Sequence, residues 1–207
     1  MRRCSRSGLS LFLLALVAAQ SATAFEYPLS SEAIREAYFL ARENSDRQTE
    51  FLERYKHNLP APKTGPDVAL VELRTPFTLV AEKIGQTNTS YHAQDAEKDF
   101  QGKTGRFGVH VEIYFTATYP KPTDTAQSLG DFWNDLKVRL KQGSEISPLK
   151  TTGRPIFSDQ TISGYMGAMI DADYDAAKID RGAPATIEVD TPDGQDVETT
   201  FDLTQLR

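Results

Sequence analysis

The chain has 207 residues, 25% of them charged, and a formal net charge of −6 at pH 7. A surface with an excess of acid repels phosphate backbones and anionic lipid headgroups, so we expect no nucleic-acid partner. A chain of this length can bury a substantial core in one domain, and its stability does not require disulfides.

Residues 1–24 have the pattern of an export signal. A cationic start at 2–6 is followed by an apolar run over 9–19 and by a small-residue cleavage pattern that ends at Ala24. The apolar run is shorter than the ~20 residues that a membrane-spanning helix needs. We predict cleavage after Ala24 and a mature chain that begins at Phe25. The alternatives are a short membrane anchor or a buried helix.

Cys4, the only cysteine, lies inside this predicted signal. The mature chain then has no disulfide, thiol nucleophile or thiolate metal ligand. An exported domain without cysteine is typical of a bacterial periplasm or exterior, which is where we place the protein. The Arg2-Arg3 pair is compatible with twin-arginine export, but the strongly apolar core favours the general secretory route. Loss of three of the 23 basic residues, against 29 acidic ones, leaves a net charge of about −9.

The first element of the mature chain is predicted to be a helix that begins at Ser30 or Ser31, since serine can cap the first turn. Apolar residues then recur at helical spacing as one stripe: Ala33, Ile34, Ala37, Tyr38 and Ala41. Ser45 and Gln48 form a capping-box pattern for a second helix. We assign 25–66 to an N-terminal helical segment that ends in a Pro-rich linker.

From residue 67 onward the hydrophobic period changes to two. The clearest strand is 106–119, in which apolar residues from Phe107 to Tyr119 alternate with mostly polar ones. This alternation predicts an antiparallel sheet with one buried face. The polar stretch 85–105 is expected to contain at most one short helix, near 93–100. The other expected strands are 68–74, 77–83, 155–159, 162–175, 185–190 and 196–203.

A central helix is predicted at 128–142. Ser128 and Asp131 form a capping pair, and Gly143 suits a C-terminal stop. Apolar residues between them recur at helical spacing: Leu129, Phe132, Trp133, Leu136 and Leu140. Trp133 would then anchor the helix on the sheet.

The segment Thr191-Pro192-Asp193-Gly194 predicts the turn of a hairpin between the last two strands. Together the elements predict an α+β fold. Its centre is an antiparallel β-sheet or β-sandwich of about six or seven strands, with an N-terminal helical pair and the central helix packed on it. We expect 67–207 to form the β-rich domain and 25–207 to fold as one unit.

Asp171, Asp173 and Asp175 are the sharpest candidate for a metal site. At period two they project from one face of a strand, about 7 Å apart. Such carboxylates repel one another unless a cation or solvent relieves them, and calcium prefers six to eight oxygen ligands. Calcium is therefore the candidate ion, and a solvated strand end is the alternative. A helix–loop–helix calcium loop is not expected, because its glycine and glutamate positions hold Ala176 and Gly182.

His110, Glu112 and Tyr114 share the polar face of the clearest strand. A histidine and a carboxylate two positions apart can act together as acid and base, or hold a metal. Without a partner from another strand neither role is specific, and the alternative is a polar, half-covered sheet face.

No phosphate-binding loop, dinucleotide fingerprint, nucleophile elbow or zinc-protease helix occurs in the sequence. The leading hypothesis is therefore an exported, non-enzymatic binding or accessory module of a bacterial envelope, with the sheet and the last hairpin as its working surface. Its partner would be an envelope protein or an extracellular ligand, and after cleavage it would not be an integral membrane protein. One alternative is a small periplasmic hydrolase or metal-assisted enzyme that uses Asp171, Asp173 and His110. Another is a structural subunit of an envelope assembly, in which an open sheet edge pairs with a partner strand.

Overall fold

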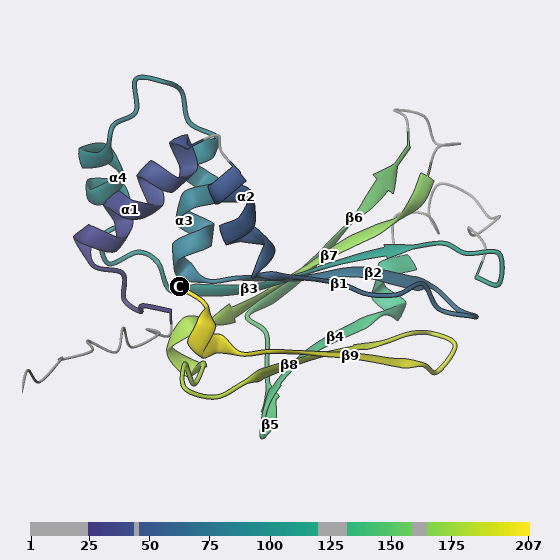
Figure 1. Cartoon of the computed structure of the whole chain (residues 1–207). Coiled ribbons are helices and arrows are strands. Elements are labelled where there is room, and N and C mark those ends of the chain that lie inside the picture. The colour runs from purple at the N-terminus through teal and green to yellow at the C-terminus, as the bar shows by residue number, and fades with distance from the viewer. Residues whose placement is uncertain (1–24, 44–45, 120–131, 159–164) are drawn as a thin grey trace, which may run out of the picture.

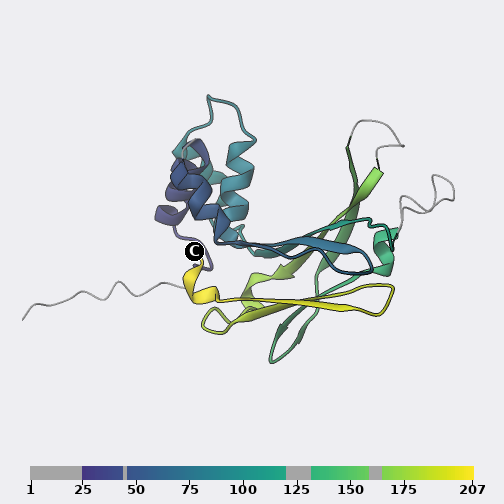
Figure 2. The same ribbon diagram turned by 45° about the vertical axis from the view of Figure 1, so that its right-hand side comes forward.

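The computed structural model describes residues 25–43, 46–119, 132–158 and 165–207 (Figure 1). The predicted signal at 1–24 and the capping serine Ser45 lie outside these residues. The described chain is an α+β protein in which two antiparallel sheets form a sandwich and the α-helices gather at one end (Figures 1 and 2). None of the helices in the described ranges has the length and hydrophobicity that a membrane crossing requires.

The helical end contains α1 (Ser31–Arg42), α2 (Asp46–Glu53), α3 (Pro76–Gly85) and α4 (Ala93–Phe100). Ser30 caps α1, because its hydroxyl accepts a hydrogen bond from the Ala33 N–H at 3.2 Å. The helices α1, α3 and α4 share a small core of their own, separate from that of the sandwich. It consists of Leu29, Ala33, Ile34, Ala37, Phe77, Val80, Ala81, Ile84 and Ala96.

The predicted strand at 77–83 is wrong, because this segment forms helix α3. Thr75 caps the helix by accepting a hydrogen bond from the Thr78 N–H, and Pro76 occupies the first turn, where no N–H is needed. Phe77, Val80, Ala81 and Ile84 are all buried. Their spacing places them on one side of a helix, and this apolar side packs against α1.

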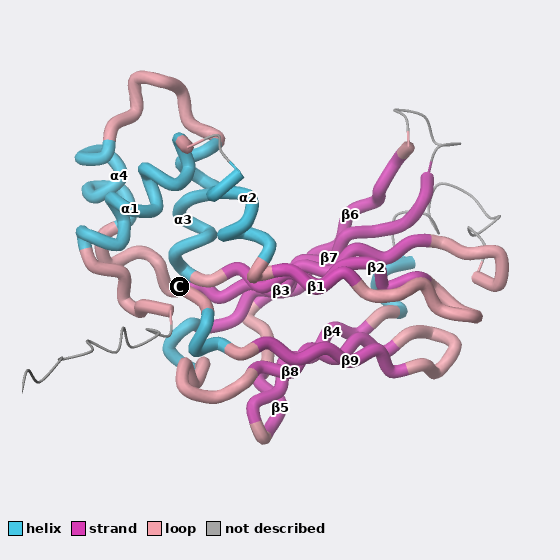
Figure 3. The backbone as a smooth tube through the Cα atoms, in the orientation of Figure 1, coloured by secondary structure: helices cyan, strands magenta, loops and turns pink. Residues whose placement is uncertain are grey.

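Sheet A has five strands in the order β1-β2-β3-β7-β6, every neighbouring pair antiparallel. They are β1 (Lys56–Asn58), β2 (Asp67–Arg74), β3 (Arg106–Tyr114), β7 (Tyr165–Asp175) and β6 (Lys150–Phe157). Sheet B has four strands in the order β5-β4-β8-β9, also antiparallel. They are β5 (Ser144–Ile146), β4 (Lys137–Gln142), β8 (Ala185–Asp190) and β9 (Asp196–Phe201). Figure 3 shows the strands of the two sheets as separate layers.

The predicted helix at 128–142 is also wrong over its described part. Only a 3-10 turn, η1 (Phe132–Asp135), precedes strand β4, and β4 turns into β5 at Gly143, whose φ is +71°. Leu136, Val138 and Leu140 are buried and alternate with charged residues, which is the period of a strand. Ser128, Leu129 and Asp131 lie outside the described residues.

Trp133 consequently docks no helix, and its indole ring instead covers Gly153 of β6. A Cβ atom built at Gly153 would overlap this ring, so the absence of a side chain there makes room for the tryptophan. The described residues contain nine strands where six or seven were expected, because β1, β4 and β5 were not predicted.

The prediction for the last hairpin is confirmed. Strands β8 and β9 are joined by a turn in which the Gly194 N–H donates to the Thr191 carbonyl at 3.0 Å. Gly194 has φ +82°, the left-handed conformation that glycine adopts most easily. The expected alternation in 106–119 is confirmed over β3, where Phe107, Val109 and Ile113 face the sandwich core.

Tyr55 fastens the segment before β1 to the last residues of the chain. Its buried hydroxyl donates to the Arg207 carbonyl at 3.0 Å and accepts from the Arg207 N–H at 2.8 Å. We expect Tyr55→Phe to lower the free energy of unfolding by about 1–3 kcal/mol, because the half-buried Arg207 N–H loses its partner and the Arg207 carbonyl keeps only the Thr75 hydroxyl. Urea titration measures this, with Tyr38→Phe as control, since the Tyr38 hydroxyl makes a single bond at a half-buried position. Equal losses in the two variants would contradict the prediction.

Candidate functional site

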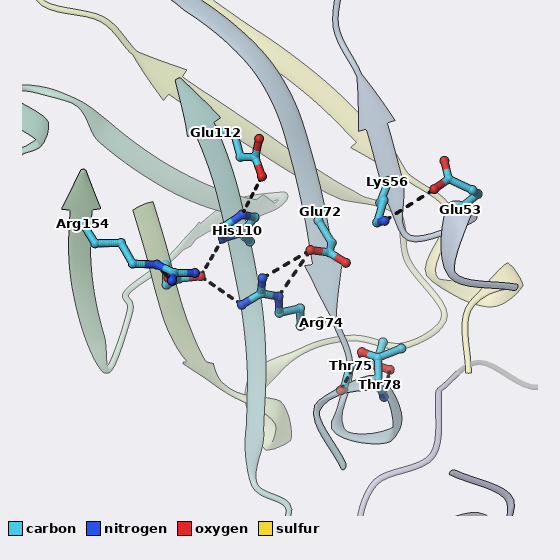
Figure 4. A network of polar contacts seen from close by, with 10 residues as sticks. Glu53, Lys56, Glu72, Arg74, Thr75, Thr78, His110, Glu112 and Arg154 are labelled. Atoms are coloured by element: carbon cyan, nitrogen blue, oxygen red, sulfur yellow. Dashed lines mark hydrogen bonds and ion pairs between the residues drawn. The ribbon is translucent and has the colours of Figure 1, made fainter. Parts of the chain in front are cut away.

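The outer face of sheet A, which points away from sheet B, carries a row of charged side chains. The alternation in β3 that buries Val109 and Val111 turns His110 and Glu112 to this outer face. Strand pairing then places Glu72 of β2 and Asp171 of β7 on either side of His110. We call this group the charged ladder (Figure 4), and it consists of Glu72, Arg74, His110, Glu112, Arg154 and Asp171.

His110 is the centre of the charged ladder and is only 3% exposed. Its Nδ1 atom lies 2.7 Å from Asp171 Oδ1, and its Nε2 atom lies 3.5 Å from Glu112 Oε1. Asp171 of the predicted metal site and His110 of the predicted polar face are thus brought together, because β7 and β3 pair with these two residues opposite each other. Both ring nitrogens face carboxylates, so neither is directed at an open substrate position.

Arg74 links the β2 and β7 sides of the charged ladder. Its Nη1 donates to Asp171 Oδ1 at 3.0 Å, and its Nη2 donates to Glu72 Oε2 at 3.3 Å. Arg154 of β6 approaches the other oxygen of Asp171, with Nε 4.0 Å away. Asp171 therefore faces three cationic or donor groups that come from three different strands.

This environment changes the acidity of Asp171. Burial acts to raise the pKa of its carboxyl, but the hydrogen bond with His110 and the charges of His110, Arg74 and Arg154 outweigh burial. The pKa of Asp171 is consequently below its ordinary value of 3.8. The carboxylate is held in its ionised form by His110, which the sequence analysis identified, and by Arg74 and Arg154, which it missed.

The other two aspartates of the predicted metal site have separate partners. Asp173 Oδ2 accepts a hydrogen bond from Arg106 Nη1 at 3.2 Å, and Asp175 caps the 3-10 turn η3 (Ala176–Lys178) by accepting from the Ala177 N–H at 3.0 Å. The three carboxylates share one face of β7, as the spacing predicts, but each is engaged with its own donor. Calcium binding there stays a prediction, and an ion would have to compete with these donors.

Tyr114 lies at the far end of the outer face of β3. Its hydroxyl donates to Glu112 Oε2 at 3.0 Å, so it orients that carboxylate. Burial, and then the neighbouring carboxylate of Glu112, raise the pKa of Tyr114 above its ordinary value.

A different group of carboxylates lies close together on sheet B. Ligand oxygens of Glu188, Asp190 and Asp196 lie within 4.8 Å of one another. Arg139 forms ion pairs with both Glu188 and Asp190, and Lys141 forms one with Glu188. Because cations already compensate Glu188 and Asp190, we interpret the cluster as a polar face of sheet B.

The charged ladder leads into a pocket of about 230 Å³ at the corner where the helices meet sheet A. Glu72 and Arg74 line the floor of this corner pocket, and α1, α2 and α3 supply the walls. The wall residues are Leu40, Ala41, Gln48, Leu52, Thr78, Ala81, Glu82 and Gly85. The outer face of sheet A is thus bounded by the helices at one end.

The sequence analysis identified His110, Glu112 and Asp171 but missed Glu72, Arg74 and Arg154. Glu72 and Arg74 alternate with the buried Val71 and Leu73 of β2, so the polar face that they share was visible in the sequence as a period of two. What the period could not reveal is that β2 lies next to β3.

The pairing of its groups decides what the charged ladder can do chemically. In the described part of the chain, His110 makes polar contacts with Asp171 and Glu112 only, and no hydroxyl or thiol lies against it as a nucleophile. Paired guanidinium and carboxylate groups held by strands, by contrast, are suited to bind complementary charges without large rearrangement.

No family model matches the sequence. No curated protein matches it either. Among solved structures, an IgNAR antibody domain C3 is similar at 14% identity, with a TM-score of 0.32, over 67% of this chain and 94% of that domain. At that TM-score the similarity carries no argument about function, and the sandwich architecture rests on the strand pairing described above.

Proposed function

We propose that the protein is an exported, non-enzymatic binding or accessory module of a bacterial envelope, and that it binds its partner with the charged ladder and the corner pocket. The observation that supports this most directly is the ladder itself. Six ionisable side chains from four strands are held on one open face and end at a pocket. The proposed export rests on the signal pattern in residues 1–24.

The composition of the ladder indicates the kind of partner. Arg154 has 63% of its side chain exposed and makes one weak contact at 4.0 Å, so its guanidinium is available to a carboxylate of a partner. Glu72 and Arg74 are already paired with each other at the pocket floor, which reduces the ordering cost of binding. A partner with a mixed-charge surface that presents acid over β6 fits this face.

The alternative role as a subunit that adds a strand to a partner sheet has one supporting and one opposing feature. Strand β6 is an edge of sheet A, paired only with β7, and most of its residues are exposed. However, Pro155 within it lacks an N–H, and proline on an edge strand is a common obstacle to further pairing. The binding-face proposal is therefore the stronger one.

The test begins with export of the full chain from a bacterial host. We expect the exported protein to begin at Phe25 when its N-terminus is sequenced. Retention of residues 1–24 on a cytoplasmic product would overturn the export part of the proposal.

The binding part is tested by cross-linked capture of envelope proteins on the parent and two variants. Arg154→Glu reverses an exposed charge of the ladder, and Lys137→Glu is its matched control on the outer face of sheet B. We expect one partner at near-equal stoichiometry, its recovery about tenfold lower with Arg154→Glu, and unchanged recovery with the control. The proposal fails if no partner is recovered, or if both variants recover it equally.

A further inference from the structure

A second pocket, of about 260 Å³, lies on the opposite side of α3 from the corner pocket. The two pockets take different faces of the same helix, since Thr78, Ala81 and Glu82 line the first, and Leu79 and Lys83 line the second. Its apolar wall is formed by Pro76, Leu79, Val80 and Phe100. The remaining lining is mostly polar and comes from the last turn of α3, from the connection between α4 and β3, from β3 itself and from β7.

Three cationic side chains converge on this second pocket from separate elements. Lys83 comes from the last turn of α3, Lys103 from the α4–β3 connection, and Arg106 from the start of β3. Asp173 is the single acid in the lining, and it is paired with Arg106 at 3.2 Å. Lys83 and Lys103 have no ion-pair partner among the residues that the structure describes. The second pocket is therefore locally positive on a chain of net charge −6.

Thr104 is a buried polar residue in the lining of this pocket. It lines the pocket, is only 8% exposed, and its hydroxyl oxygen is closed to solvent without a hydrogen-bond partner among the described residues. A buried hydroxyl without a partner lowers stability, and such groups are rare in folded proteins unless a bound species satisfies them. A polar group of a ligand in the pocket would supply that partner after a small shift.

We infer that this second pocket binds a small organic anion. The carboxylate or phosphate of the ligand lies among Lys83, Lys103 and Arg106, and a short apolar body lies against Leu79 and Phe100. The volume is just below the roughly 300–1,000 Å³ of pockets for drug-sized ligands, so the ligand is smaller than these. No residue of this pocket belongs to the charged ladder, so the two surfaces can be tested separately.

The test is calorimetric titration of the full chain with four probes. Benzoate and phenyl phosphate carry the anionic group on a ring, benzyl alcohol is the neutral analogue, and inorganic phosphate lacks the apolar body. We expect at least one of the two aromatic anions to bind, about tenfold or more tighter than benzyl alcohol and than inorganic phosphate. Whichever of these two anions binds more tightly shows whether the pocket prefers a carboxylate or a phosphate. Binding should weaken as salt is added, because exposed cations are screened.

Variants then assign the binding to this pocket. The double substitution Lys83→Gln and Lys103→Gln removes two charges, and the control pair Lys63→Gln and Lys137→Gln removes two exposed charges elsewhere. We expect the first pair to weaken binding of the aromatic anion about tenfold and the control pair to leave it unchanged, with the same melting temperature for both. Equal affinities in the two pairs would overturn the inference. So would the absence of binding by both aromatic anions at about 10 mM, or benzyl alcohol binding as tightly as the tighter of the two anions.

Discussion

Replacement of Gly167 by alanine is expected to lower the free energy of unfolding by about 3 kcal/mol or more. Gly167 lies in β7, between Tyr114 of β3 and Ile156 of β6. A Cβ atom built there overlaps the carbonyl of Ile113 and the Cα atom of Tyr114. These are backbone atoms of a neighbouring strand, so β3 and β7, two inner strands of sheet A, would have to separate where β3 ends. Overpacking usually costs about 1–3 kcal/mol, and here no flexible side chain can yield.

Gly85→Ala is the matched control for this substitution. Gly85 is the last residue of α3, and a Cβ atom at this position meets no heavy atom within 4 Å. Alanine is favoured over glycine in a helix by up to about 1 kcal/mol, so this variant should be as stable as the parent or slightly more stable. Urea unfolding of the three proteins measures both effects. Equal stability of the two variants would show that β3 and β7 are not packed as described.

Asp171→Asn is expected to lower the free energy of unfolding by about 2 kcal/mol at pH 7. The substitution removes the carboxylate charge that His110, Arg74 and Arg154 all contact. It also leaves His110 buried without its shortest polar contact. Removal of one member of a fully buried ion pair costs about 3–5 kcal/mol. Asp171 retains 28% exposure of its side chain, so solvent compensates part of this cost.

The same substitution should change how stability depends on pH. Because the pKa of Asp171 is lowered by folding, its ionised form stabilises the protein above the ordinary pKa of 3.8, and this contribution disappears as the pH falls through the lower pKa of the folded state. The gap between parent and Asp171→Asn should therefore be full at pH 7 and close progressively below pH 3.8.

Urea titrations at neutral and acidic pH measure this gap, with Asp196→Asn as the control. Asp196 is an exposed residue of β9 without an ion pair among the described residues, and its loss should change stability by no more than about 0.5 kcal/mol. A gap for Asp171→Asn that stays constant between pH 7 and the acid limit would rule out the charged ladder as its cause.

Several elements were predictable because their signals are local. The serine cap and apolar stripe of α1 lie within a few turns of each other, and the boundaries of α4 at 93–100 were predicted correctly. The alternation along β3 and the Thr191–Gly194 turn likewise depend on neighbouring residues. Each of these segments has one conformation that satisfies its own backbone and side chains.

Two segments were misread because their local patterns fit two structures. Apolar residues at Leu136 and Leu140 are four apart, which is compatible with a helix and with alternate positions of a strand. Strand β4 forms because β8 offers it a hydrogen-bonding partner and a buried face, neither of which is visible along the chain. In the segment predicted as the strand 77–83, Pro76 instead occupies the first turn of a helix that Thr75 caps.

The sequence by itself determined the alternation of β3, the hairpin turn, α1 and the shared face of the three aspartates, because these depend on residues within about ten positions. Only the tertiary structure decided the strand order β2-β3-β7-β6. That order brings Arg74 and Arg154 to Asp171 across 97 and 17 positions of sequence, and brings Lys83 and Arg106 to one pocket. Contacts at such separation follow from which strands pair, and pairing is a property of the whole buried core.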